Sequence, residues 1–158
     1  MSVDTKTVQG RRNLHFESLD EIVADAQKLV NSPTTKMLGN WPLERILSHL
    51  AMALNRSVDG FNAKASIFIR LIGPFIKGGI LRKGMPAGRM LPKEVVVSFY
   101  PEVPSPQDAL QNLALAVERV GKEKMTAAHP VFGKMTHEEW RQLHLRHSEL
   151  HLSFALPG

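Results

Sequence analysis

The chain has 158 residues, 43% of them hydrophobic and 22% charged, a composition typical of one globular domain and not of a disordered or fibrous protein. No residue is cysteine, which excludes disulfides, thiolate metal ligands and a cysteine nucleophile. The net charge is +5, but the basic residues are spread along the chain with few aromatic residues between them, which argues against a nucleic-acid partner.

The first two of four predicted long helices span about residues 18–31 and 41–60. Ser18 begins the first one, because Glu21 follows at the spacing of a capping box. Apolar residues then recur every three or four positions and define one face of the helix. The second helix follows Asn40, which is able to cap it, and apolar residues again mark one face.

Residues 61–104 are predicted to form a long connection. Between Gly60 and Lys93 the chain carries seven basic residues and no acidic one. The glycines and prolines of this basic segment predict a short broken helix and a loop, not a continuous element. The segment fits either a solvated connector, whose apolar side packs on the helices, or an anion-binding lid. Residues 95–100 have strand propensity, but without a partner strand we expect an extended loop.

The third and fourth helices are predicted at about residues 105–121 and 136–155. The third starts at Ser105, which is followed by a proline and an acidic residue in the first turn. The fourth starts at Thr136, which forms another capping box with Glu139. The fold class predicted from these patterns is all-α, with a crossover connection between the second and third helices and one domain over residues 1–158.

The fourth helix carries three histidines on one face. At about 100° per residue, His144, His147 and His151 lie within roughly 60° of one another, and Trp140 shares their stripe. Arg146 and other polar residues lie roughly opposite, so the histidines belong to the half expected to be buried. Two histidines one turn apart can reach one metal ion. The spacing leaves open whether this pair is His147 with His151 or His144 with His147, and it requires a third ligand from elsewhere.

His49 lies at the edge of the apolar face of the second helix, and Ala53 and Arg56 share its stripe one and two turns later. Taken alone, such a histidine is more often a hydrogen-bonded core residue than a metal ligand.

The four helices, the long connection, His49 and the histidine pair of the fourth helix together resemble the DinB-like family of metal-binding four-helix bundles. Residues 39–51, Gly-Asn-Trp-Pro-Leu-Glu-Arg-Ile-Leu-Ser-His-Leu-Ala, are similar to the second-helix motif of this family. Residues 11–21, 129–140 and 143–152 are similar to the corresponding segments of one of its uncharacterised subfamilies. The resemblance covers nearly the whole chain and implies a DinB-like four-helix bundle.

By position, the resemblance implies that His49, His147 and His151 are the metal ligands. Three histidines leave one position of a divalent ion open for water or a substrate, as in catalytic zinc sites. We expect a divalent transition metal, with zinc or nickel as the leading candidates, although iron and manganese also accept nitrogen ligands. Relatives often carry polar residues around the last ligand, where this chain has Leu150, Leu152 and Phe154.

The resemblance also implies chemistry on a small-molecule substrate, because characterised DinB-like proteins include bacillithiol- and mycothiol-dependent transferases and a maleylpyruvate isomerase. Such low-molecular-weight thiols are anionic, and Arg56 and the basic segment are candidates to hold their carboxylates. His129, Trp140 and His144 match subfamily positions of unknown role and are further candidates for substrate contact or catalysis.

Two functions remain open at this point. The first is a metal-dependent thiol S-transferase or related enzyme, and the alternative is a non-catalytic, stress-related binding module on the same bundle. A homodimer is compatible with both. The most apolar run, residues 65–81, is too short and too charged to span a membrane, and the polar N-terminus does not look like a signal peptide. We therefore expect a cytoplasmic protein without a membrane partner.

Overall fold

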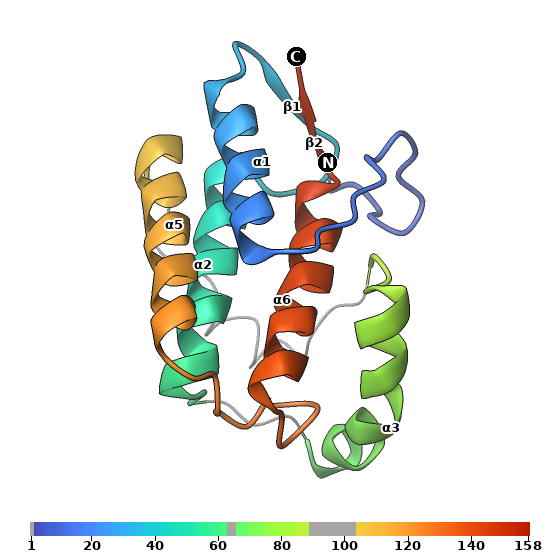
Figure 1. Cartoon of the computed structure of the whole chain (residues 1–158). Helices are drawn as coiled ribbons and strands as arrows, with labels where there is room; N and C mark the ends of the chain where they lie inside the picture. Colours follow the sequence, from blue (N-terminus) through green and yellow to red (C-terminus); the bar gives the residue numbers. More distant parts are fainter. Residues whose placement is uncertain (1, 63–65, 89–103) are drawn as a thin grey trace.

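The computed structural model describes residues 2–62, 66–88 and 104–158 (Figure 1). These residues form helices and one two-stranded sheet, in the order α1 (Leu19–Asn31), β1 (Thr35–Met37), α2 (Leu43–Asp59), α3 (Ile67–Lys83), α5 (Pro106–Lys122), α6 (His137–Leu152) and β2 (Ala155–Pro157). The described part of the chain is therefore predominantly helical, and it contains each of the four predicted long helices. The extended loop predicted at residues 95–100 lies outside the described residues.

The predicted caps start three of these helices. The hydroxyls of Ser18, Ser105 and Thr136 each accept a hydrogen bond from the backbone amide three residues later. At Thr136 the pairing is reciprocal, because the Glu139 carboxylate accepts a hydrogen bond from the Thr136 amide. Each cap satisfies amide groups that the first helical turn leaves unpaired, which is why these starts could be read from the sequence.

The start of α2 differs from the prediction. Pro42 takes the cap position without a side-chain hydrogen bond, and the helix begins at Leu43. The Asn40 side chain instead accepts a hydrogen bond from the Val3 amide and donates one to the Val3 carbonyl. Asn40 therefore holds the N-terminal segment beside the start of α2 and does not cap the helix.

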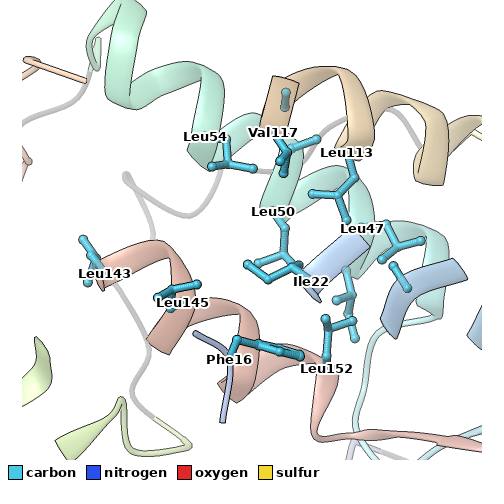
Figure 2. Packing of buried hydrophobic residues seen from close by; sticks show 14 of the residues in the cluster. Phe16, Ile22, Leu47, Leu50, Leu54, Leu113, Val117, Leu143, Leu145 and Leu152 are labelled. Carbon is cyan, nitrogen blue, oxygen red and sulfur yellow. The ribbon is translucent and has the colours of Figure 1, made fainter. Parts of the chain in front are cut away.

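The main core lies between α1, α2, α5 and α6. The contact between α2 and α5 is the most extensive, and α1 packs on α5 and α6. Figure 2 shows Ile22, Leu47, Leu50, Leu113 and Leu152, one or two from each helix, meeting in this core. Burying one leucine side chain contributes about 2 kcal/mol, so these contacts fix the positions of the helices that bear the histidines.

Two sides of helix α6 pack against other parts of the chain, and the histidine stripe lies on a third side. Leu145 and Leu152 face the main core. On the other side, Arg146 and Glu149 form an ion pair whose side chains are each only 11% exposed. Phe16 covers this pair, because its amide donates to Glu149 and its carbonyl accepts from Arg146. With two sides held in this way, α6 presents its histidine stripe in a fixed direction.

The fourth helix ends at Leu152, before its predicted end at residue 155. Residues Ala155–Pro157 leave the helix and pair antiparallel with Thr35–Met37. The two strands have three residues each, and such short segments carry no recognisable alternation of apolar and polar residues. The sheet was therefore missed, and it ties the end of the chain to the segment between α1 and α2.

The prediction of a short broken helix in the basic segment is wrong. Helix α3 is continuous over 17 residues with Pro74 inside it, and it packs on α6. A Cβ atom on Gly73 would lie 2.0 Å from the Val131 carbonyl oxygen, so this glycine permits close packing of the helix on the loop before α6. The Lys77 ammonium also pairs with Glu139 in the first turn of α6 at 2.6 Å.

The solvated connector was expected to pack its apolar side on the other helices. In the structure the outer side of α3, which faces solvent, is apolar as well. Apolar residues occur almost all around this helix, and only one side of it can face the protein. The exposed apolar side chains are Ile67, Phe68, Leu71, Ile72, Phe75 and Ile76. Within the described ranges, no helix combines the length and the hydropathy that crossing a membrane requires.

Candidate metal centre and its cavity

The first histidine of the cluster comes from the middle of α2. His49 is buried, with 7% of its surface exposed. It follows Ile46 by one turn and precedes Ala53 by one turn, and all three side chains line the same cavity. The position at the edge of the apolar face, seen in the sequence, is thus the side of α2 that faces away from the main core.

The other two histidines come from α6. His147 and His151 are one helical turn apart, and both line this cavity as partly buried side chains. Since their spacing puts them on one face of the helix, the sequence predicted their proximity. The structure groups them with His49, and His144 lies one turn earlier in α6 and outside this group.

The three histidines form a compact cluster of nitrogen donors. One ring nitrogen of each lies within 4.8 Å of the others. The Nε2 atoms of His49 and His147 are 3.0 Å apart, and the centroids of the three rings are separated by 4.7–4.9 Å. In a tetrahedral zinc site, nitrogens bonded at 2.0–2.1 Å are about 3.3 Å from one another. The cluster therefore needs only small side-chain movements to hold one ion.

Burial disfavours the charged form of His147 and His151. The pKa of His151 is lowered to about 3, first by burial and then by the nearby positive charges of His49 and Arg11. Burial likewise lowers the pKa of His147 well below its usual range, and the neighbouring histidines add to the effect. Because only a neutral imidazole has a free lone pair, this environment favours metal binding at neutral pH.

Trp41 packs against the cluster from the segment just before α2. Its ring stacks on His151, with the centroids 5.5 Å apart and the planes at 7°, and meets His49 edge-on at 5.2 Å. The sequence pointed to Trp41 only as part of the motif that starts the second helix. Its contact with His151, about 110 positions later, depends on how α2 and α6 pack and could not be read from local patterns.

The cluster opens into a cavity of about 440 Å³. Its walls come from the segment before α2, from α2, α3 and α6, and from the loops that follow α2 and α3 and precede α6. The apolar residues that line it include Trp41, Ile46, Phe61, Ile80, Met85, Val131, Phe132, Trp140, Leu143, Leu150 and Phe154. None of the described residues lining it is Asp, Glu, Lys or Arg.

Three of the four candidates for substrate contact lie in this cavity. Trp140 stacks on His144, with the centroids 5.4 Å apart and the planes at 19°, and on Phe61 at 5.9 Å and 9°. Its indole nitrogen donates to the Ala127 carbonyl. His129 accepts hydrogen bonds at Nδ1 from two amides of its own loop. These contacts build an aromatic wall in the cavity that also contains the histidine cluster.

His144 is the most buried polar residue of this wall. It is 3% exposed, and its Nε2 atom has no hydrogen-bond partner in the described part of the chain. Burial, aided by the charge of His129, lowers the pKa of His144 to about 3. The side chain is therefore neutral and retains an unused hydrogen-bonding atom.

Arg56, the fourth candidate, lies elsewhere. It lines a separate cavity of about 470 Å³ together with Asp59 and Arg119. Of the four described cations of the basic segment, Lys77 is paired with Glu139, and none of them lines the histidine cavity. The described residues thus give no cationic wall to the cavity in which an anionic thiol was expected.

A family model described as "Protein of unknown function (DUF1569)" matches residues 8–158. The matched range contains all three histidines of the cluster and nearly every residue that lines the cavity. Comparison with curated proteins gave no match, and neither did comparison with solved structures.

Proposed function

Since the chain belongs to the DUF1569 family, whose matching model states no function, we propose its function from the site. We infer that His49, His147 and His151 together hold one divalent transition metal ion. The observation that carries this proposal is the convergence of three nitrogen donors within 4.8 Å at one end of a cavity. Three protein ligands leave a coordination position open, as is usual in catalytic sites and unusual in structural ones.

The same proposal places the chain in the DinB-like superfamily of metal-binding four-helix bundles. The contacts between α1, α2, α5 and α6 support a bundle of four helices, and a long connection joins α2 to α5. The positions of the histidines, one on α2 and two on α6, support the resemblance further. In this assignment α3 belongs to the crossover connection and closes one side of the cavity.

The reaction that we propose is transfer to or from the sulfur of a low-molecular-weight thiol, or a related reaction. When bound, a divalent ion in such a site lowers the pKa of a coordinated water or thiol. The chain's own residues surround the reacting groups with apolar side chains, orient His151 through the stacked ring of Trp41, and place His144 in the wall of the same cavity. The assignment of a thiol rests on the resemblance and on the open coordination position. Arg56 is not part of the proposed site.

Elemental analysis of the purified protein, without an affinity tag, tests this proposal. We expect about one equivalent of a transition metal, zinc or nickel first, in the wild type and none in a His49→Ala/His151→Ala variant. A His15→Ala variant is the matched control, because the side chain of this histidine is 71% exposed and is not one of the clustered nitrogen donors. It should keep the metal.

The helical content, measured by circular dichroism, should be nearly the same in all three proteins, because apolar contacts and not the ion hold the helices together. If the wild type remains without metal after incubation with zinc, nickel, iron or manganese, the proposal of a metal site is wrong.

A non-catalytic binding module is the second candidate function. The described residues that line the cavity include no carboxylate, lysine or arginine, which leaves histidine to act as general acid or base. The binding module is favoured because the pKa values of His129 and His144, about 4 and about 3, lie far below the neutral range in which such a group works best. Turnover distinguishes the two candidates. A metal-loaded protein that binds thiols or apolar ligands but transforms none of a panel of thiol and electrophile pairs would support the binding module.

A further inference from the structure

We propose that the histidine cavity takes an uncharged, largely apolar ligand, aromatic in its main part, whose polar group is hydrogen-bonded by His144. This inference deepens the proposed function. It rests on that function in one respect, namely that the ligand meets a partner bound to the metal. The evidence for it, however, is the wall of the cavity and not the histidine cluster.

The size and lining of the cavity define the body of the ligand. A volume of about 440 Å³ lies in the usual range for small-molecule sites. Trp140, Phe61 and His129 present aromatic rings to it, and Ile80 and Leu143 add aliphatic surface. Rings of this kind pack well against flat apolar molecules.

The lack of charged side chains in the described lining disfavours an ionised ligand body against this wall. Away from the proposed metal, a carboxylate or ammonium group buried against this wall would lose its hydration without gaining an opposite charge, which is strongly unfavourable. Two described cations have partners outside the cavity lining. Lys77 pairs with Glu139. Arg11 lies over the outer side of the site, against the ring of Phe154, and donates to Ser153. Neither cation lines the cavity. An anionic group is therefore expected to remain outside the cavity.

His144 supplies the polar contact. Two other polar side chains of the wall are bonded to the backbone, since Asn40 bonds Val3 and His129 accepts at Nδ1 from Val131 and Phe132. His144 Nε2 is buried without a partner among the described residues, a state that costs stability unless a ligand or water satisfies it. Stacking on Trp140 fixes the orientation of the His144 ring. A neutral imidazole can donate or accept at this atom, according to its tautomer.

The test compares three phenylalkyl probes of similar shape: 2-phenylethanol, ethylbenzene and the anion 3-phenylpropionate. Their dissociation constants are measured by NMR titration with the full chain, both as purified and after treatment with a chelator. In the chelated protein, 2-phenylethanol should bind at least about tenfold more tightly than 3-phenylpropionate. Equal binding of the two, or no binding of any probe, would overturn the inference without any need for a variant.

Variants of His144 then test its role. His144→Phe should weaken binding of 2-phenylethanol by about three- to tenfold, the usual effect of one hydrogen bond, and leave binding of ethylbenzene unchanged. His144→Gln, which retains a donor and an acceptor, should restore the preference for the alcohol. If His144→Phe weakens both probes equally, or neither, His144 is not the polar contact and this part of the proposal is wrong.

The two proposals fail separately. Probe binding by the chelated wild type, together with no metal in elemental analysis, would retain the apolar ligand site and overturn the metal function. One equivalent of metal in a protein that binds none of the probes would retain the metal function and overturn the apolar ligand site.

Discussion

Arg12 lies outside the histidine cavity but helps to hold the end of α6 that carries His151. Its guanidinium makes two hydrogen bonds of 2.7 Å with the Asp25 carboxylate on α1 and one of 3.0 Å with the Leu152 carbonyl. The preceding residue, Arg11, donates to the Ser153 hydroxyl. The N-terminal segment therefore fixes the last turn of α6, and with it the position of one proposed metal ligand.

We expect Arg12→Met to lower the free energy of unfolding by about 2 kcal/mol, because it leaves the carboxylate of Asp25 without its partner. That carboxylate is only 14% exposed, so water replaces the lost contact poorly. Urea denaturation measures the change. Lys122→Met is the control, since its ion pair with Glu118 is on the surface and should contribute nothing measurable. Equal effects of the two substitutions would contradict this account.

At the scale of the helices, the sequence predicted most of what local rules govern. Caps and apolar spacing predicted α1, α2, α5 and α6 to within a few residues. The spacing of the histidines in α6 predicted that two of them share a site, but it did not decide between His147 with His151 and His144 with His147. His49 was assigned by resemblance alone, because the contact between α2 and α6 depends on packing. Packing also explains why Arg56 is not near the site. Arg56 and His49 lie on one stripe of α2, but the cavity covers only the part of that stripe that contains His49.

Helix α3 shows where the local rules fail. Its glycines and proline are ordinary signals for a break, yet Gly73 is needed for close contact with Val131, and tertiary packing outweighs the low helix propensity of such residues. The rule treats every glycine alike, whereas the structure distinguishes them by what lies beside each.

A pair of substitutions in α3 tests this distinction. Gly79→Ala should raise the free energy of unfolding by about 0.5–1 kcal/mol, because alanine favours the helix and, among the described residues, no atom outside the neighbouring helix backbone lies within 4 Å of the new Cβ. Gly73→Ala should lower it, since the new Cβ would lie 2.0 Å from the Val131 carbonyl oxygen. Thermal and urea unfolding measure both. Stabilisation by both substitutions would mean that α3 does not pack on the loop before α6.

For the whole molecule, the buried histidines set the response to acid. The pKa values of His129 and His144 are lowered to about 4 and about 3 by burial. In the unfolded chain a histidine takes up its proton near pH 6.5. Between these limits the unfolded state binds more protons than the folded state, so the free energy of unfolding falls as the pH falls. The carboxylates with lowered pKa values, such as Glu139 beside Lys77, are ionised throughout the upper part of this window.

Unfolding by urea in the presence of a chelator should therefore show a clear loss of stability between pH 7.5 and pH 5.5. Each buried histidine contributes roughly 1 kcal/mol over this interval. His144→Phe should make the dependence on pH shallower than in the wild type, whatever its effect on stability at pH 7.5. A wild-type stability that is constant or rises toward pH 5.5 would show that these histidines are protonated in the folded protein.

The aromatic lining also makes the cavity visible by optical spectroscopy. The chain has two tryptophans, and both line the cavity: Trp41 stacks on His151 and Trp140 on His144. All of its intrinsic tryptophan emission therefore arises beside the proposed metal and ligand sites. An open-shell ion such as nickel should quench this emission, and closed-shell zinc should not. The protein thus carries its own fluorescent reporter, which would distinguish the two leading candidates for the metal without a label.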